Sequence, residues 1–235
     1  TFSLTGQQGN AGKPDIPSNV MENEGFTQYY RMQWYLNEFT SDEAAWNYSG
    51  NDGGIQELMY NKYTANNSFA LGLYYRLYFD ITLCNSYIND IGKDEQRLAE
   101  ARFIRAYNYL SVLDIFGAGP FCTKVSSENA AYYNRQQLFD YVESELLDIE
   151  SKMAEPGKNT YGRADKVAVW QLLSRLYLNA EVYTGHERYT DAMTYAEKVI
   201  NNGYYHLMKT GKTNPATGEV YSPYQMLFLA DNNTN

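Results

Sequence analysis

Apolar side chains recur at three- and four-residue steps through the middle of this 235-residue chain, and this period constrains its fold most. The spacing predicts two long helices, one from Phe69 to Gly92 and one from Asp94 to Gly117. A glycine closes each of them, and Asp94 is a good N-cap for the second. Pro120 lies just beyond the second helix, which it cannot continue.

Three further segments show the same helical period. They run from Arg135 to Ala154, from Lys166 to Tyr183 with Asp165 as N-cap, and from Thr190 to Asn201. Weaker helical patterns cover residues 25–39 and 55–60, and between them Thr40 and Glu43 have the spacing of a capping box for one short turn. Consecutive helices joined by short, glycine-containing loops indicate antiparallel helical hairpins.

A weak internal repeat supports this arrangement. Residues 105–117 and 175–185 share an arginine, a stripe of Tyr and Leu, and a closing glycine. They start 70 residues apart, close to twice the period of about 34 residues that tetratricopeptide (TPR) repeats have. We therefore expect an all-α fold, a TPR-like array of helical hairpins with irregular loops.

The domain organisation follows from composition along the chain. Residues 1–24 are rich in Gly, Asn and Pro, show no period and are predicted to be a lead-in loop. Residues 25–235 are predicted to form one helical domain. The chain ends on a polar run, which suggests the N-terminal part of a longer protein.

Charge and aromatic content narrow the classes of function. The net charge is -9, from 19 basic and 28 acidic residues, so no concentrated basic face is available for nucleic acid. Tyrosine and asparagine are abundant, with 24 and 22 residues, whereas there are 2 histidines. Tyrosine combines an apolar ring with a polar tip, and asparagine donates and accepts hydrogen bonds. This composition favours the binding of a polar ligand over acid–base chemistry.

Motifs for catalysis and nucleotide binding are absent from the sequence. There is no phosphate-binding GxxxxGK[ST], no GxGxxG after a strand and no GxSxG, and neither His186 nor His206 has a suitable carboxylate or thiol pattern around it. Acidic residues of one predicted helix are expected to form a solvated face rather than a catalytic pair; these are Asp140, Glu143, Glu145 and Asp148. The chain is predicted not to be an enzyme.

Metal and cofactor sites are not predicted either. Cys84 and Cys122 lack the spacing of metal ligands, and we expect them to be buried and inert, with the question of a disulfide left open. Asp52 lies in an NDGG run that has too few oxygen ligands for calcium and is predicted to be a plain turn.

The segment WNYSGNDGG, residues 46–54, does not match a packed core. Trp46 and Tyr48 are two residues apart among polar neighbours rather than periodic aliphatic ones. A flat aromatic face and nearby amides are what a neutral sugar ring requires. On the residues alone, a sugar platform and a structural aromatic cluster both stay open. Trp34 and Trp170 lie in helical stripes and are predicted to pack.

The chain also contains five strings that are similar to one known family. They are YLNEFTSDEAAW (35–46), AEARFIRAYNYLSVLDIFGAGPF (99–121), YGRADKVAVWQLLSRLYLNAEVYTG (161–185), YAEKVINNGYYHL (195–207) and LFLADN (227–232). These strings resemble the SusD/RagB family of glycan-binding outer-membrane lipoproteins of Bacteroidetes. The resemblance covers nearly the whole chain from about Gly25, points to the N-terminal half of such a protein, and is strongest for the starch-binding type.

The resemblance implies a function and a site. It implies non-catalytic glycan binding at the outer-membrane surface, beside a TonB-dependent SusC-like transporter, with a lipid anchor that this chain does not contain. The starch-type pattern falls on Arg31, Trp46, Tyr48 and Asn51. Tyr48 stands where that pattern has a second tryptophan, so the platform is smaller. Further binding residues, and any calcium site, are left to the second half of the protein.

A different class of function stays open beside this one. The same helices would suit a TPR-type protein–protein adaptor that binds no sugar. That alternative leaves the segment WNYSGNDGG unexplained.

Overall fold

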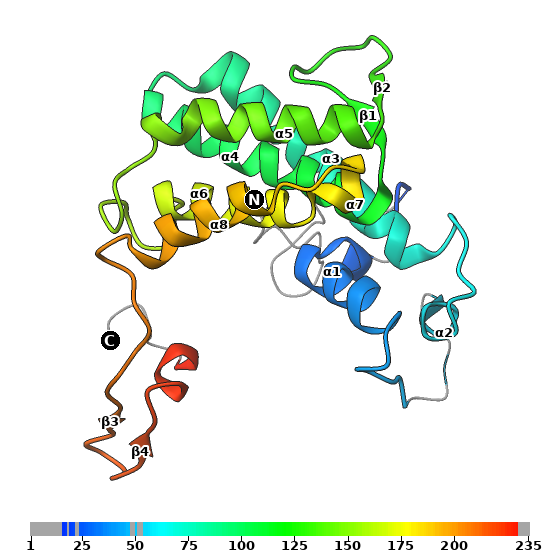
Figure 1. Ribbon diagram of the computed structural model, residues 1–235. Helices are drawn as coiled ribbons and strands as arrows, with labels where there is room; N and C mark the ends of the chain where they lie inside the picture. Colours follow the sequence, from blue (N-terminus) through cyan, green and yellow to red (C-terminus); the bar gives the residue numbers. More distant parts are fainter. Residues whose placement is uncertain (1–15, 18, 22–23, 48–49, 51–53, 230–235) are drawn as a thin grey trace.

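Helices dominate the computed structural model, which describes residues 16–17, 19–21, 24–47, 50 and 54–229 (Figure 1). The α-helices of this part are α1 (Tyr29–Glu38), α2 (Ile55–Met59), α3 (Ser68–Ser86), α4 (Glu95–Ser111), α5 (Arg135–Ile149), α6 (Lys166–Leu178), α7 (Ala180–Thr184) and α8 (Tyr189–Ile200). Shorter helical turns are η1 (Glu24–Thr27), the π turns η3 (Tyr87–Ile91) and η4 (Val112–Phe116), η5 (Glu150–Lys152) and η6 (Gln225–Phe228). The strands pair antiparallel, β1 (Gly119–Phe121) with β2 (Ala131–Tyr133) and β3 (Lys212–Thr213) with β4 (Val220–Tyr221).

The helices stack as neighbouring hairpins. Helix α4 packs against both α3 and α5, α6 packs against α8, and α1 lies on α3 (Figure 1). One continuous apolar core runs between them, built from fully buried side chains such as Leu77, Leu113, Leu146, Val169 and Leu176. The predicted all-α class of helical hairpins is therefore confirmed.

The predicted helix starts are confirmed by their caps. Asp94 accepts a hydrogen bond from the backbone N–H of Arg97 at 2.9 Å, and Asp165 accepts one from Val167 at 2.9 Å. Each carboxylate satisfies a backbone donor that has no partner inside its helix. These contacts are local, which is why the sequence pattern was sufficient to find them.

Helices α3 and α4 both end in π turns, which the sequence pattern did not predict. At the end of α4, the N–H of Gly117 lies 3.1 Å from the carbonyl oxygens of both Val112 and Leu113. Gly117 has a φ of 77°, and a Cβ there would lie 2.8 Å from Nε of Arg135. Only glycine fits this position without strain, so the helix ends where the pattern predicted.

A close backbone contact sets α1 on α3. A Cβ on Gly72 would lie 1.8 Å from the carbonyl oxygen of Phe26, so glycine is required there. One turn later, the buried Arg76 donates from Nε to the carbonyl oxygen of Thr27 at 2.7 Å. These contacts hold η1, and with it the start of α1, on the face of α3.

Two local predictions are wrong. The helix predicted from Lys166 to Tyr183 is interrupted at Asn179, whose amide donates back to the carbonyl oxygen of Arg175 at 2.9 Å. Thr40 and Glu43 form no capping box: the Thr40 hydroxyl donates to the Leu36 carbonyl at 2.7 Å and so closes α1 instead. Short polar side chains compete for nearby backbone groups in this way.

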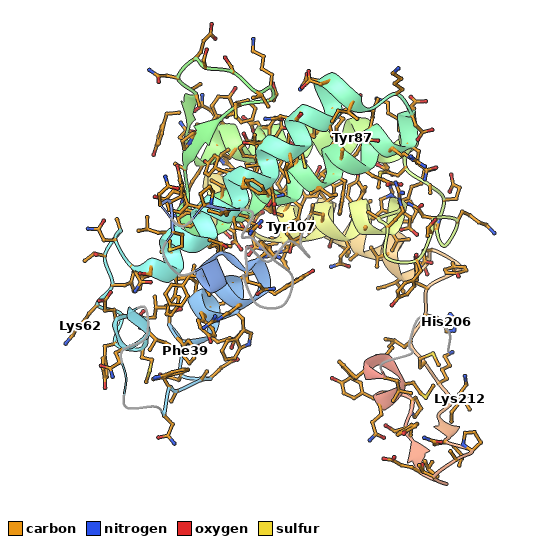
Figure 2. The ribbon with its side chains drawn as sticks, turned by 180° about the vertical axis from the view of Figure 1, so that it is seen from behind. Phe39, Lys62, Tyr87, Tyr107, His206 and Lys212 are labelled. Atoms are coloured by element: carbon orange, nitrogen blue, oxygen red, sulfur yellow. The ribbon has the colours of Figure 1, made fainter. Side chains whose placement is uncertain are left out.

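The two ends of the described chain differ in how they meet the helices. Of the predicted lead-in loop, Ile16 and Met21 are buried in the core. After α8 the chain leaves the helical body, and the β3–β4 hairpin stands apart from it in both views (Figures 1 and 2). Tyr205 anchors the start of this arm, because its hydroxyl donates to Asp165 at 2.7 Å.

A buried ion network joins the central helices, and it overturns part of the solvated face predicted for α5. Glu145 is buried and accepts from Arg105 at 2.5 Å and from Arg102 at 2.8 Å and 3.1 Å. Arg105 also donates to Asn85 of α3 at 2.8 Å. Burial alone would raise the pKa of Glu145, but the hydrogen bonds from both arginines outweigh it and lower this pKa.

The change Glu145→Gln should lower the free energy of unfolding by about 3 to 5 kcal/mol, because it leaves the buried Arg105 without its counter-charge. Urea unfolding at pH 7 measures this. The pKa of Glu145 is lowered in the folded state, so its contribution is present above about pH 4.5 and is lost as the pH falls through the folded pKa.

The exposed Asp140 on the same helix supplies the matched control. Asp140→Asn should change the stability by less than about 0.5 kcal/mol. Equal effects of the two changes would show that the network is not a main source of stability.

Candidate functional site

Two of the four predicted site residues can be placed in the structure. Arg31 lies on α1, and Trp46 lies in the segment between α1 and α2. Tyr48 and Asn51 lie outside the described residues, so their part in the site stays a prediction.

Arg31 is half-buried and stacks on aromatic rings. Its guanidinium carbon lies 5.5 Å from the ring centre of Phe26 and 5.3 Å from that of Tyr35. Both distances are within the range of cation–π contacts. These contacts hold the Arg31 side chain beside the two rings.

Trp46 is half-buried, and its own loop and the core fix its orientation. The indole N–H donates to the carbonyl oxygen of Gly50 at 3.1 Å, and the ring packs edge-on against Phe39 with centres 6.3 Å apart. The backbone N–H of Trp46 also points to the sulfur of Met59 at 3.3 Å. Trp46 thus has a structural role, which does not prevent a rigid indole from stacking on a sugar.

The structure connects Arg31 and Trp46 through a row of rings. Arg31, Tyr35 and Phe39 follow at four-residue steps on one face of the α1 region, and Trp46 continues from Phe39. Eight residues of helix span about 12 Å, so Arg31 and Phe39 are not direct neighbours. Phe39 is buried at 5% exposure, so the row joins the two partly exposed site residues through packed rings rather than along an open surface.

The helical pattern predicts that Trp34 packs in the core, and this prediction is wrong. Trp34 is 49% exposed on α1, although its ring also meets Phe39 edge-on at 5.3 Å. Neighbouring Tyr30, one turn earlier, is exposed as well. A short helix with aromatic residues on all sides cannot bury them all, and this is why the stripe misled. Trp170 does pack, since it is half-buried and its indole N–H donates to Glu150 at 2.7 Å.

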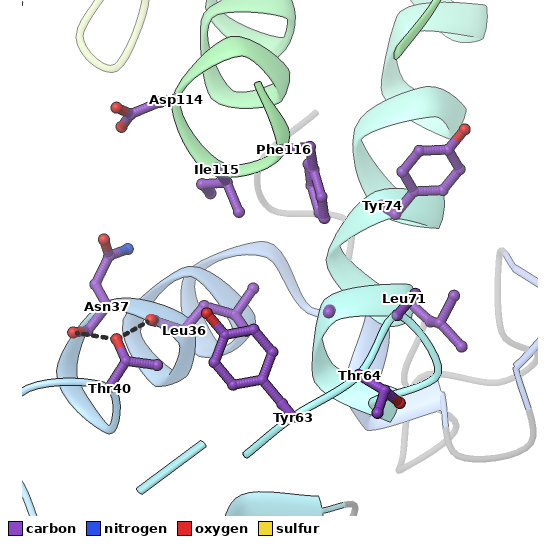
Figure 3. Close-up of a pocket in the computed structure, with 12 residues that line it drawn as sticks. Leu36, Asn37, Thr40, Tyr63, Thr64, Leu71, Tyr74, Asp114, Ile115 and Phe116 are labelled. Carbon is purple, nitrogen blue, oxygen red and sulfur yellow. Dashed lines mark hydrogen bonds between the residues drawn. The ribbon is translucent and has the colours of Figure 1, made fainter. Parts of the chain in front are cut away.

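A pocket of about 590 Å³ lies on another side of α1, and neither Arg31 nor Trp46 lines it (Figure 3). It is bounded by the C-terminal end of α1, the loop before α3, α3 itself and η4. Its lining residues are Leu36, Asn37, Thr40, Tyr63, Thr64, Ala65, Ala70, Leu71, Tyr74, Asp114, Ile115 and Phe116. Neither Tyr63 nor Tyr74 was among the site residues that the sequence predicted.

The acidic residues of α5 are engaged in structural contacts. Glu143 accepts from the Tyr177 hydroxyl at 2.9 Å and from Arg188 at 3.1 Å. Asp148 accepts from Arg102 at 2.6 Å and from Lys152 at 2.8 Å. The contacts of Glu143 with Tyr177 and Arg188, and of Asp148 with Arg102, tie α5 to neighbouring helices.

No group of three or more His, Cys, Asp or Glu side chains suited to a metal occurs among the described residues. Cys84 and Cys122 are both free thiols, which settles the disulfide question left open above. Burial, and secondarily the charge of Asp80, raises the pKa of Cys84 to about 12. In the same part of the chain, no helix has the length and apolar character needed to cross a membrane.

Comparison with known proteins bears on the identity of the chain. No protein-family model matches it. It is 35% identical, over 239 aligned residues that cover the whole chain, to the starch-binding protein SusD of Bacteroides thetaiotaomicron. The chain spans 40% of the length of that curated relative.

Solved structures share the fold. A SusD-like protein of Bacteroides fragilis matches 93% of this chain and 45% of its own, with a TM-score of 0.63 and 17% identity. Surface glycan-binding protein A of Bacteroides uniformis matches 88% of this chain and 50% of its own, with a TM-score of 0.56 and 16% identity.

These matches define the class first: an all-helical protein with the SusD-type arrangement of hairpins. With the sequence identity along the whole chain, they also establish the family. The chain belongs to the SusD-like family, as its sequence motifs predicted.

The two free thiols should differ in reactivity. Iodoacetamide at pH 8 should modify Cys122, which is partly exposed, and leave Cys84 intact, because only thiolates react and the pKa of buried Cys84 is about 12. Mass spectrometry of tryptic peptides measures both. Unfolding in urea serves as the control and should make both thiols reactive. Rapid modification of Cys84 in the folded chain would contradict its burial.

Proposed function

We propose that this chain is part of a non-catalytic protein that binds an oligosaccharide or polysaccharide, with a starch-like glucan as the first ligand to test. The support is the likeness to a protein named for starch binding together with the row of residues from Arg31 to Trp46. The row carries the proposal, because its ring contacts hold a partly exposed cation at one end and a partly exposed indole at the other.

Each site residue has a defined role in this proposal. Trp46 and Tyr48 stack on the apolar faces of sugar rings, while Arg31 and Asn51 hydrogen-bond to hydroxyl groups. Trp46 is held before the ligand arrives, so little side-chain freedom is lost on binding. The smaller ring of Tyr48 leaves room for a glucan other than starch.

The proposal includes a cellular setting. The protein acts at the surface of the outer membrane, anchored by a lipid outside this chain, and delivers the glycan to a TonB-dependent SusC-like transporter. The similarity to a surface glycan-binding protein supports the surface location.

The change Trp46→Ala should weaken maltohexaose binding by about 1 to 3 kcal/mol, as removal of an aromatic stacking partner does elsewhere. Isothermal titration calorimetry measures the loss. Because Trp46 also packs on Phe39, a thermal melt of the variant must accompany the titration.

Trp34→Ala is the matched control, since it removes an exposed indole from the same helix region but outside the proposed site. This variant should bind maltohexaose with the same affinity as the unchanged protein. Unchanged affinity in a folded Trp46→Ala variant, for maltohexaose and for other glucans, would refute the platform.

A second observation favours a protein partner. Tyr189, Met193 and Ile200 lie at i, i+4 and i+11 on α8 and are all exposed, with Ile200 at 75%. Apolar residues at this spacing form a stripe on one side of a helix, and such a stripe is typical of a protein interface. We propose that this stripe contacts the transporter; the same stripe would serve an adaptor that binds no sugar.

In the full-length protein, Met193→Glu should therefore reduce copurification with the transporter. The affinity for glucans should stay unchanged. A charge on the stripe would be buried without a partner in the complex. Thr194→Glu adds the same charge on α8 beside the stripe and should have little effect. If both variants copurify with the transporter equally well, the transporter contacts another part of the protein. If the protein binds the transporter but its melting temperature does not change with sugar, the adaptor function is favoured.

A further inference from the structure

The pocket between α1, α3 and η4 has the size and build of a ligand site. Its volume of about 590 Å³ lies within the usual range for small-molecule pockets. It is reached from a different side of α1 than the row from Arg31 to Trp46, and it shares no residue with that row.

Aromatic rings form its walls. Tyr63 is 49% exposed in the loop before α3, and Figure 3 shows its ring lying across the pocket. Phe116 points into the pocket from η4 and meets Tyr74 edge-on, with ring centres 5.7 Å apart. The pocket thus offers flat apolar faces from two sides.

The π turn η4 places the side chains that form one side of the pocket. The turn widens the end of α4, and Gly117 then stops the helix in the left-handed region. Asp114, Ile115 and Phe116 of this turn all line the pocket. Single π turns inside α-helices are frequent at functional sites.

Polar groups face the same space. Asn37 and Asp114 lie on one side of the pocket in Figure 3. The Asn37 amide donates one hydrogen bond, to the Gln33 carbonyl at 2.7 Å, and among the described residues its Oδ1 and the Tyr63 hydroxyl have no protein partner. These groups offer acceptors and donors to a ligand that carries hydroxyls.

Asp114 also gives the pocket a charge preference. Its two oxygens accept from Arg175 at 2.8 Å and from Tyr183 at 2.6 Å, which holds the carboxylate in place. The carboxylate still has lone pairs that can accept hydrogen bonds from hydroxyl groups, and its ion pair with Arg175 leaves no net positive charge there to bind an anion.

We infer that this pocket binds one neutral sugar ring, as a second site separate from the proposed row. Tyr63 and Phe116 contact the ring faces, and Asn37, Asp114 and the Tyr63 hydroxyl bond to its hydroxyls. The sugar class rests on the proposed function, whereas the place and the charge preference rest on the pocket itself.

The test is an NMR titration of the isotope-labelled chain with maltose, and in parallel with glucuronate as the anionic probe. Maltose should shift the backbone amides of Thr64, Leu71 and Phe116. Tyr63→Ala should weaken this binding at least about fivefold through the lost stacking. Tyr60→Ala removes an even more exposed tyrosine, 66% against 49%, that does not line the pocket, and it should leave maltose binding unchanged.

Asp114→Asn tests the charge preference independently of stacking. It should raise the affinity for glucuronate relative to maltose by about fivefold, because the positive charge of Arg175 is then left uncompensated beside the pocket. An unchanged ratio would contradict the role of Asp114.

Trp46→Ala separates this inference from the proposed function. If it weakens glucan binding while Tyr63→Ala does not, the proposed function stands and the second site is wrong. If Trp46→Ala has no effect but the pocket amides still shift and respond to Tyr63→Ala, the second site stands and the row is wrong. Absence of maltose shifts at the pocket overturns the inference.

Discussion

The buried carboxylate of Glu145 is the contact on which the arrangement of the helices depends. It neutralises Arg105 from α4, which in turn reaches Asn85 of α3, so one charged cluster connects three helices. Buried charges are tolerated only when paired, which makes this packing specific rather than merely apolar. The next helix pair is attached by similar means, because Glu143 of α5 binds Tyr177 of α6 and Arg188 beside α8.

The surface that carries the proposed site is built on that frame by short-range contacts. Gly72 and Arg76 of α3 hold the backbone before α1, and α1 then presents Arg31 and Tyr35. Beyond α1 the chain is secured by side-chain amides, since Asn61 donates to the Thr40 carbonyl at 3.3 Å and Asn67 to the Gly54 carbonyl at 3.0 Å. Asn61 and Asn67 thus serve loop structure, a role that the asparagine content alone did not indicate.

The burial of side chains proved harder to predict than the helices that carry them. Glu145 and Asp140 look alike in an acidic helical pattern, yet Glu145 is buried by arginines from a helix forty residues earlier. Trp34 looks like a core residue in its stripe and is half exposed. Of the candidate site, the sequence pattern pointed to Arg31 and Trp46 but could not show that a row of rings lies between them, or that Trp46 is anchored to Gly50.

The sequence alone determined the helical period, the caps at Asp94 and Asp165, the glycine stop at Gly117 and the family motifs, because each depends on residues a few positions apart. The tertiary structure decided which charges are buried, which aromatic rings face solvent, that both thiols are free and that a pocket lies between α1, α3 and η4. Those properties depend on contacts between residues distant in sequence, and packing alone sets them.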